Sequence, residues 1–401
     1  MSVNIKTKVI VIGGGYAGLR VVEKLSKNSA IEMTLLDKNC YHYMQTDVYD
    51  LIANEDDFAG VSVDLFTYCM GFENATFLKQ EVREVDFLQK RVVTQRERIS
   101  YDYLIIAVGS RTKFAKNVDG LREYAYGIKA LHRAMYFKQK FEMSLFHKVD
   151  ESGTACTPLN IVVAGAGLSG VEIAAQMASF SQEFYKKNHF ICRSLNIVLV
   201  NAAEHILNGL DRELVEKSEQ RLKKLGVQIK NREKVVSLTK RSVTLSSGET
   251  LAMDFMIFAG GIEPNALIYR LDVKKTAQGF LQTDEYLRLE GYEDVYALGD
   301  ATTIYKGSQP LAPTADIAEQ MAELCAKNIE HSLHNRELKK HTIASRGVLI
   351  ALGHGYSSAK VFGFYFHGYF AFLMKKLIEK LYARNLDSYS KKGCKKIFDN
   401  E

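Results

Sequence analysis

The order of apolar and polar positions predicts a strand, a glycine turn and a helix at two places in the chain. The first is "VIVIGGGYAGLRVVEKL", close to the start, and the second is "NIVVAGAGLSGVEIAAQM", which begins at Asn160. A further pair of buried strands, "DYLIIAVGS" from Asp102 and "DFMIFAGGI" from Asp254, is separated by 152 residues, as are the two glycine turns. Two landmarks at one offset predict two nucleotide-binding α/β domains in tandem.

Each turn carries the glycine spacing of a dinucleotide site. The first glycine permits the tight turn, the second lets the backbone approach a pyrophosphate, and the third lets the helix pack on the strand. The phosphates then lie at the helix N-terminus, where free N–H groups and the helix dipole favour negative charge. The glycines are Gly13, Gly15 and Gly18 in the first copy and Gly165, Gly167 and Gly170 in the second.

The residue that ends the second strand of each copy is expected to bind a ribose. In the first copy the strand within "IEMTLLDKN" ends at Asp37, which is 24 residues after Gly13 and is an acid, as a ribose site requires. In the second copy the strand ends at Asn201, which hydrogen-bonds a hydroxyl less strongly than a carboxylate does. No arginine follows at once to bind a 2′-phosphate, so the pattern favours NADH over NADPH, and a second fold without a ligand stays open.

Close to the end of the chain, Gly368–Asn385 has the pattern of an amphipathic helix. One face is apolar and the other carries Lys375, Lys376, Glu379 and Lys380. Such a helix either packs on its own domain or lies in a membrane interface with its lysines toward the lipid head groups. The apolar face consists of Phe370, Leu373, Met374, Leu377, Ile378 and Leu381, with Phe366 extending it.

Composition adds a basic C-terminal region to this picture. The chain has 401 residues, 47% of them hydrophobic, and a net charge of +6, and its last 39 residues from Gly363 hold eight Lys or Arg against four acids. This charge suits an anionic lipid surface. Nucleic-acid binding is not expected, because the basic residues are not interleaved with stacking aromatics. The longest apolar run is 14 residues, Val361–Met374, whereas a membrane-spanning helix needs roughly 20.

The six cysteines are scattered, with no CxxC and no metal-ligand spacing. We therefore expect reduced thiols, a cytosolic compartment and no metal site. The first residues enter a strand pattern at once, which leaves no room for a signal peptide.

"GYEDVYALGDAT", from Gly291 to Thr302, resembles the closing FAD motif of flavoproteins with two dinucleotide-binding domains. Within that group the chain most resembles the type II NADH dehydrogenases, which are single-subunit NADH:quinone oxidoreductases. The resemblance covers nearly the whole length and rests on "VIGGGYAGL", "AGAGLSGVEIA", "FAGGIEPN", "YALGDAT", "PTADIAEQMAE" and the terminal helix.

The resemblance implies an activity and a set of site residues. NADH would give hydride to bound FAD, and two electrons would pass to a membrane quinone without proton pumping. Asp300 would bind the flavin's ribityl or phosphate region, and Lys375 or Lys376 would reach the flavin. Further cofactor-binding residues would be Tyr16, Ala17, Lys38, Val82, Gly109 and Ala318 for FAD and Gly260 in the second copy.

The reacting groups would be supplied by two helices. Glu172 matches a family glutamate near the nicotinamide, although it also suits a helix N-terminus. The quinone motif Ala-Gln-x-Ala-x-Gln is matched from Ala315 to Gln320, with Asp316 in place of the first glutamine. If Asp316 is buried, it is either ionised at a cost or protonated and a hydrogen-bond donor.

One related activity, disulfide reduction, is excluded by the cysteine supply, and two other functions stay open. Disulfide reductase chemistry needs a CxxxxC in the first domain, where only Cys40 precedes residue 60. A sulfide:quinone oxidoreductase would use paired cysteines, for which Cys156 and Cys325 are the candidates. The other open alternative is a non-enzymatic NADH-responsive flavoprotein that binds a partner through its basic tail.

The expected fold class is therefore α/β, with two Rossmann-like domains and a membrane-associating C-terminal unit. We expect the FAD-binding domain at 1–120 and 280–345, the NADH-binding domain at 121–279, and membrane attachment through 346–401. The predicted location is peripheral, on the cytoplasmic side of the cell membrane. The quinone type stays open, as does the oligomeric state, for which a homodimer is one option.

Overall fold

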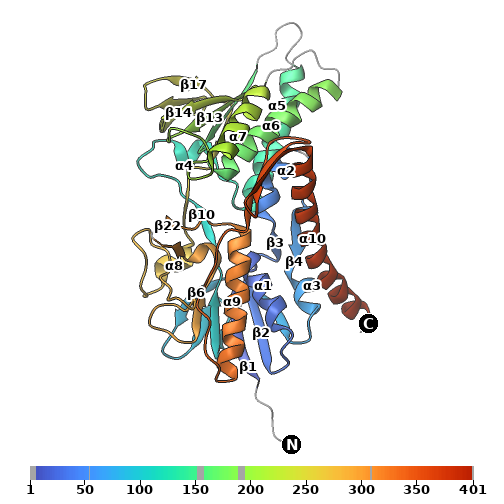
Figure 1. Cartoon of the computed structure of the whole chain (residues 1–401), viewed down its shortest axis with the longest axis vertical. Helices are drawn as coiled ribbons and strands as arrows, with labels where there is room; N and C mark the ends of the chain where they lie inside the picture. The colour runs from blue at the N-terminus through green and yellow to red at the C-terminus, as the bar shows by residue number, and fades with distance from the viewer. Residues whose placement is uncertain (1–5, 54, 151–157, 188–194, 308, 400–401) are drawn as a thin grey trace, which may run out of the picture.

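The computed structural model describes residues 6–53, 55–150, 158–187, 195–307 and 309–399. Two five-stranded parallel sheets form the two ends of the molecule (Figure 1). The first has the order β20 (Val295–Ala297), β9 (Tyr103–Ile106), β1 (Thr7–Ile12), β2 (Ile31–Asp37) and β5 (Ala75–Lys79). The second has the order β11 (Ala125–Tyr126), β18 (Phe255–Phe258), β12 (Leu159–Ala164), β13 (Leu195–Asn201) and β14 (Gln228–Asn231).

The two sheets confirm the predicted repeat. Strands β1 and β12 begin at Thr7 and Leu159, and β9 and β18 begin at Tyr103 and Phe255, so both pairs keep the offset of 152. Hydrogen bonds repeat as well: Lys8 N donates to Asp102 Oδ2 at 2.7 Å, and Asn160 N donates to Asp254 Oδ2 at 2.8 Å. The α/β fold class with two Rossmann-like domains is therefore confirmed.

The central strands are apolar throughout because both faces of each parallel sheet are covered. In β1, Val9 and Val11 face one apolar cluster while Ile10 and Ile12 face another. The first cluster includes helices α1 (Tyr16–Leu25), α3 (Leu65–Met70) and α9 (Ala315–Leu333). The second includes the antiparallel sheet of β6 (Val82–Asp86), β7 (Arg91–Thr94) and β8 (Arg98–Ser100), with α8 (Ala266–Arg270).

The second domain is organised in the same way. Helices α5 (Leu131–Asp150), α6 (Leu168–Lys187) and α7 (Arg212–Lys224) contribute to the cluster on one face of its sheet, while α4 (Leu121–Tyr124) and the sheet of β15 (Val235–Leu238), β16 (Ser242–Leu245) and β17 (Thr250–Ala252) contribute to the other. A two-stranded antiparallel sheet of β10 (Ser110–Thr112) and β19 (Ile262–Pro264) joins the domains.

Smaller elements complete the first domain and its margins. They are the pair β3 (Tyr41–Tyr43) and β4 (Ser62–Asp64), the short helix α2 (Val48–Ile52), the 3-10 turns Gln45–Asp47 and Gly299–Ala301, and the pair β21 (Tyr305–Lys306) and β22 (Gln309–Pro310).

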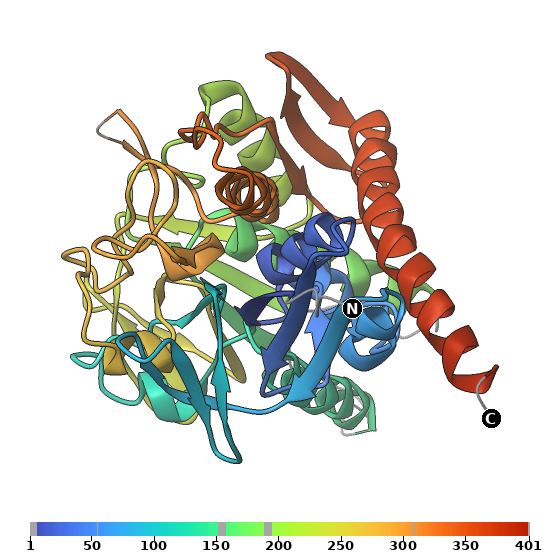
Figure 2. The ribbon, with the colours of Figure 1, turned by 90° about the horizontal axis from the view of Figure 1, so that it is seen from below.

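The C-terminal unit is a three-stranded antiparallel sheet followed by a 30-residue helix, α10 (Tyr369–Phe398). Its strands are β23 (Gly347–Ala351), β24 (Ser357–Val361) and β25 (Phe364–Gly368). Helix α10 runs along the outer edge of the molecule (Figures 1 and 2). It meets α3 closely, because a Cβ at Gly393 would lie 1.9 Å from Thr67 O and one at Gly71 would lie 2.4 Å from Tyr389 O. Among the described helices, none combines the length and apolar character that crossing a membrane requires.

The orientation of α10 departs from part of the prediction. Its apolar face points outward, with Phe370 63% and Leu377 58% exposed. The side chains of Lys375 and Glu379 point inward and are only 11% and 13% exposed. The expectation that Lys375 and Lys376 face lipid head groups is therefore wrong, because both lysines make ion pairs with carboxylates beneath the helix.

Candidate functional site

A cavity of about 640 Å³ lies at the carboxyl edge of the first sheet, where dinucleotides bind in such folds. The first glycine turn lines it, as do four other predicted cofactor residues, Asp37, Lys38, Val82 and Gly109. Residues from the loop after β19, including Asn265, close another side. The Nδ2 of Asn265 donates to Val108 O at 3.0 Å, which fixes this loop against the strand end.

The first glycine of each turn has no room for a side chain. At Gly13 φ is +109°, and a Cβ would lie 2.3 Å from Ala107 O; at Gly165 φ is +104°, and a Cβ would lie 2.6 Å from Ala259 O. The contacted residues are again 152 apart. The middle glycines, Gly15 and Gly167, have no neighbouring atom within 4 Å of such a Cβ. Both turns therefore have the space that a pyrophosphate would occupy.

The ribose position differs between the two copies. Asp37 Oδ2 accepts a hydrogen bond from Gly14 N at 2.8 Å, and its Oδ1 accepts one from Asn39 N at 2.8 Å. Burial raises the pKa of Asp37, and these backbone donors oppose that rise. Asn201 is instead buried, and its Nδ2 donates to Ala203 O at 3.1 Å and to Asn231 Oδ1 at 2.8 Å. Its predicted ribose contact stays untested, and its amide is already used inside the protein.

Asp300 lies in the turn after β20 and belongs to a three-residue polar cluster that the sequence did not reveal. Its Oδ2 accepts hydrogen bonds from Ser110 Oγ at 2.6 Å and from Lys129 Nζ at 2.8 Å. Ser110 and Lys129 both line the cavity. Ser110 could have been noticed because it follows Gly109 at a strand end, but no pattern marks Lys129.

Four further predicted cofactor residues lie close to the two glycine turns. Ala17 and Ala318 flank Gly299, since a Cβ on that glycine would lie 3.6 and 3.5 Å from their Cβ atoms. Gly260 follows β18, where a Cβ would lie 2.6 Å from the ring of Phe258. Tyr16 opens α1, and its hydroxyl lies 2.9 Å from Thr46 Oγ1.

A buried histidine that the sequence did not single out connects the first glycine turn to α10. The Nδ1 of His42 lies 3.0 Å from Gly14 O, and its Nε2 lies 3.1 Å from the Tyr382 hydroxyl. Burial lowers the pKa of His42 to about 4, so the ring is neutral at physiological pH. The contact lets a residue of the C-terminal helix steady the loop at the cavity.

Glu172 lies on α6, in the second domain, yet its carboxylate contacts the C-terminal unit. Its Oε1 accepts a hydrogen bond from Ala351 N at 3.0 Å and lies 3.3 Å from Lys375 Nζ. Lys375 Nζ also lies 3.2 Å from Glu379. Burial raises the pKa of Glu172, while Lys375 and the Ala351 N–H oppose that rise. The pair joins the second domain to α10 through a buried charge contact.

Further acids surround this pair. Asp50 accepts from Gln176 Nε2 at 3.0 Å and pairs with Lys376, and Tyr49 donates its hydroxyl proton to Glu379 at 2.6 Å. Asp47 has a buried Oδ1 with no hydrogen-bond partner among the described residues. Desolvation raises the pKa of Asp50 to about 6, and desolvation followed by the charge of Glu379 raises that of Asp47 to about 7.

Asp316 and Gln320, the predicted quinone contacts, lie together at the start of α9. Gln320 Nε2 donates to Asp316 Oδ2 at 3.0 Å and to Ala344 O at 2.9 Å. The Asp316 side chain is 31% exposed, and its Oδ1 lies 3.6 Å from the guanidinium of Arg346. The Asp316 side chain is therefore half-buried beside the Arg346 cation. The two alternatives stated for a fully buried aspartate do not apply to it. Contact with a quinone stays a prediction.

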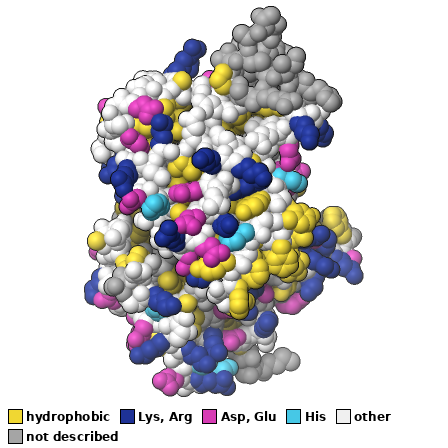
Figure 3. Space-filling model, turned by 45° about the horizontal axis from the view of Figure 1, so that its top comes forward, with side chains coloured by type: hydrophobic (Ala, Val, Ile, Leu, Met, Phe, Trp, Pro, Cys, Tyr) yellow, Lys and Arg dark blue, Asp and Glu magenta, His cyan; other side chains and the backbone are white. Residues whose placement is uncertain are grey.

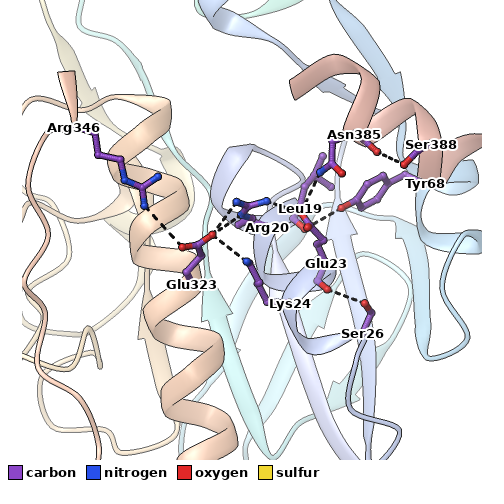
Figure 4. A network of polar contacts seen from close by, with 10 residues as sticks. All are labelled: Leu19, Arg20, Glu23, Lys24, Ser26, Tyr68, Glu323, Arg346, Asn385 and Ser388. Carbon is purple, nitrogen blue, oxygen red and sulfur yellow. Dashed lines mark hydrogen bonds and ion pairs between the residues drawn. The ribbon is translucent and has the colours of Figure 1, made fainter. Parts of the chain in front are cut away.

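A chain of polar contacts continues from this helix to α10 (Figure 4). Arg346 approaches Glu323 on α9 at 4.0 Å, and Glu323 pairs with Arg20 on α1 at 2.8 Å. Arg20 pairs with Glu23 at 2.8 Å, and Glu23 accepts from Asn385 of α10 at 3.4 Å. Helix α1, which begins at the first glycine turn, therefore makes polar contacts with both α9 and α10.

The outward face of α10 and the strand before it form an apolar patch. Hydrophobic side chains gather on the right of the molecule, where α10 runs, with Lys and Arg beside them (Figure 3). The exposed basic residues of α10 are Lys380, Arg384, Lys391, Lys392 and Lys395. The exposed apolar residues are Phe362, Phe364, Tyr369, Phe370, Leu373, Leu377, Ile378 and Leu381.

Two glycine turns of matching geometry, followed by an aspartate that is bonded to two residues of the cavity, define an oxidoreductase with two dinucleotide-binding domains. The chain belongs to the pyridine nucleotide-disulphide oxidoreductase family, whose model matches residues 7–322. The disulphide chemistry in that name needs a cysteine pair in the first domain, and only Cys40 precedes residue 60.

Named relatives align over nearly the whole chain. A type II NADH:quinone oxidoreductase of Staphylococcus saprophyticus is 26% identical over 93% of this chain and 94% of its own length. The NADH dehydrogenase-like protein YutJ of Bacillus subtilis is 28% identical over 86% and 90%. The resemblance to type II NADH dehydrogenases is therefore confirmed.

Solved structures share the fold. NDH2 of Plasmodium falciparum, in complex with NADH, superposes with a TM-score of 0.84 at 19% identity, covering 96% of each chain. The sulfide:quinone oxidoreductase of Aquifex aeolicus superposes with a TM-score of 0.82 at 18% identity, covering 96% of this chain and 92% of its own.

Proposed function

We propose that the protein transfers electrons from NADH through bound FAD to a membrane quinone, without pumping protons. The observation that carries this proposal is the pair of open glycine turns in a chain that also presents an outward apolar helix. A quinone resides in the bilayer, so an enzyme that reduces it benefits from an edge that lies in the membrane interface. The likeness to named type II NADH:quinone oxidoreductases supports the same activity.

The residues of the first domain fit FAD. Gly13 and Gly15 leave room for a pyrophosphate, and Asp37 presents a carboxylate at the cavity for a ribose. Asp300, held by Ser110 and Lys129, presents acceptors to hydroxyl groups. When bound, FAD supplies a two-electron carrier between a hydride donor and a quinone.

The second domain supplies the nucleotide site, and the C-terminal unit supplies Lys375, which pairs with Glu172 of that domain. Gly165, Gly167 and Gly170 would hold the pyrophosphate of NADH. Glu172, whose pKa burial raises and Lys375 lowers, would lie beside the nicotinamide as a carboxylate paired with the Lys375 ammonium. Asp316 and Gln320 would orient the quinone from α9.

The lipid-facing part of the proposal rests on the apolar patch and its basic neighbours. The patch would lie in the head-group and acyl boundary on the cytoplasmic side, while Lys380, Arg384, Lys391 and Lys392 contact anionic lipids. NADH oxidation with several quinones, with and without anionic vesicles, tests this function. We expect turnover that rises with vesicles, whereas no turnover with any quinone would reject the proposal.

Sulfide oxidation is a second candidate because the A. aeolicus enzyme has the same fold. Of the two candidate cysteines, Cys156 lies outside the described residues. Cys325 is 0% exposed within the core between α9 and the first sheet, and burial raises its pKa well above the usual value. A buried neutral thiol is a poor nucleophile. We therefore expect sulfide to leave the flavin oxidised.

Glu172→Gln is expected to lower turnover by at least about tenfold while leaving FAD content unchanged. Glutamine keeps the shape and can still accept from Ala351 N, but it removes the charge that faces Lys375. The matched control is Glu213→Gln, because Glu213 also pairs with the C-terminal unit, through His367 at 3.0 Å, but is 46% exposed. Stopped-flow reduction by NADH at unchanged rate in Glu172→Gln would argue against this role.

The double change Leu377→Glu and Leu381→Glu is expected to reduce vesicle binding by about tenfold or more. Both side chains are more than half exposed, so the fold should tolerate the change, whereas deletion of α10 would remove the buried Lys375 contacts. Leu88→Glu is the control, since Leu88 is 97% exposed outside the C-terminal unit. Cosedimentation with vesicles measures the effect, and binding equal to that of Leu88→Glu would contradict membrane attachment by this face.

A further inference from the structure

The second domain does not repeat the ribose-binding acid of the first. Asn201 occupies the strand end, is 6% exposed, and has both amide hydrogens committed to Ala203 O and Asn231 Oδ1. Its Oδ1 accepts from Ala203 N at 3.3 Å. A hydroxyl of the adenosine ribose would have to compete with these bonds. These bonds give Asn201 a structural role in the loop after β13.

The loop after β13 returns to the second glycine turn. Leu207 N donates to Ala166 O at 2.7 Å, and Arg232 N donates to Ala203 O at 2.9 Å. These two bonds hold the loop between the glycine turn and the end of β14. Glu204 stands on this loop, directly after Ala203, with 61% of its side chain exposed. It is the first acid after the strand end.

The segment after β14 in the second copy contains one residue more than the equivalent segment after β5 in the first copy. Gln80 N, one residue beyond β5, donates to Asp37 O, whereas in the second copy the equivalent bond to Asn201 O comes from Glu233, two residues beyond β14. The inserted residue is Arg232, whose φ is +61°. Left-handed backbone is unfavourable for a residue with a side chain, and such strain is concentrated at functional sites. The inserted arginine makes an ion pair with Glu204.

We propose that Glu204 binds the adenosine ribose of NADH and, together with Arg232, sets the preference for NADH over NADPH. Its carboxylate would accept hydrogen bonds from the ribose hydroxyls, as an acid at the strand end does in other dinucleotide folds. The same charge would repel a 2′-phosphate and occupy Arg232, the cation that could otherwise bind one. This inference rests on the proposed use of NADH.

Binding of two redox-inactive fragments, ADP-ribose and its 2′-phosphate, tests the pair by calorimetry on the FAD-loaded protein. We expect the wild type to prefer ADP-ribose by about a hundredfold. Glu204→Gln should weaken ADP-ribose binding about tenfold and tighten binding of the 2′-phosphate about tenfold, because Arg232 is released. Adding Arg232→Gln to that variant should abolish the gain for the phosphate.

The control is Glu216→Gln, an exposed acid of the same domain that pairs with Arg212, and it should leave both affinities unchanged. Flavin content should be equal in all variants. The inference is overturned if Glu204→Gln changes the ratio of the two affinities no more than Glu216→Gln does, or if the wild type binds neither fragment. A wild type that binds ADP-ribose but never oxidises NADH would reject the proposed function and leave the recognition by Glu204 in place.

Discussion

Lys375→Met lowers the free energy of unfolding by about 3–5 kcal/mol near neutral pH, because it leaves buried carboxylates without their cation. Lys375 Nζ lies 3.3 Å from Glu172 and 3.2 Å from Glu379, and its side chain is 11% exposed. Methionine matches its length but carries no charge. Urea unfolding of the holoenzyme, followed by circular dichroism, measures the loss.

Lys391→Met is the matched control on the same helix. Lys391 is 76% exposed and pairs with Asp387 at 2.7 Å, so its removal should change stability by no more than about 0.5 kcal/mol. Equal stabilities of the Lys375 and Lys391 variants would show that the buried charge cluster does not form.

The loss caused by Lys375→Met should depend on pH. The pKa of Asp47 is raised to about 7 and that of Asp50 to about 6, so each carboxyl favours the folded state below its unfolded pKa and loses that contribution as pH rises. Removing Lys375 raises these values further. The difference from the wild type should therefore be smaller at about pH 5.5 than at about pH 8, and a difference independent of pH would contradict the cluster.

The second prediction with a large effect distinguishes the FAD site in the first domain from the NADH site in the second. Gly15→Val should reduce flavin content to roughly a tenth or less, because a side chain there blocks the approach of a pyrophosphate. Gly167→Val should keep the flavin but lose its reduction by NADH. A Cβ added at either glycine would have no atom within 4 Å, and Gly15 has a φ of −86°, so the first substitution is sterically compatible with the fold.

Absorbance spectra and anaerobic NADH titration measure both outcomes. Gly248→Val is unsuitable as a control because φ is +89° there, so the two glycine variants serve as controls for each other. Loss of flavin in both variants, or in neither, would contradict two independent sites.

The sequence predicted the repeat and the glycine turns because tight backbone approach leaves only glycine at Gly13 and Gly165. It also pointed to Asp37, which ends a buried strand, whereas Asp300 was assigned from the resemblance to a flavoprotein motif. These features depend on the spacing of residues that are near each other in the chain, and such spacing can be read from the sequence alone.

Other features depend on contacts between distant segments. The sequence pattern of α10 predicted an apolar face and a charged face, but it could not predict which face points outward. The orientation depends on the contact of Lys375 with Glu172, which lies 203 residues earlier in the chain. For the same reason, spacing could not reveal that Lys129 joins Asp300. The use of Asn201 inside its own loop was also hidden, because it depends on a bond to Asn231 in the neighbouring strand.

The most direct test of the central claim is an anaerobic cycle on vesicle-bound protein. NADH should bleach the yellow flavin absorbance, a membrane quinone should restore it, and sulfide should have no effect. Flavin that NADH does not bleach, or reduced flavin that no quinone reoxidises, would contradict the proposed electron transfer from NADH to quinone.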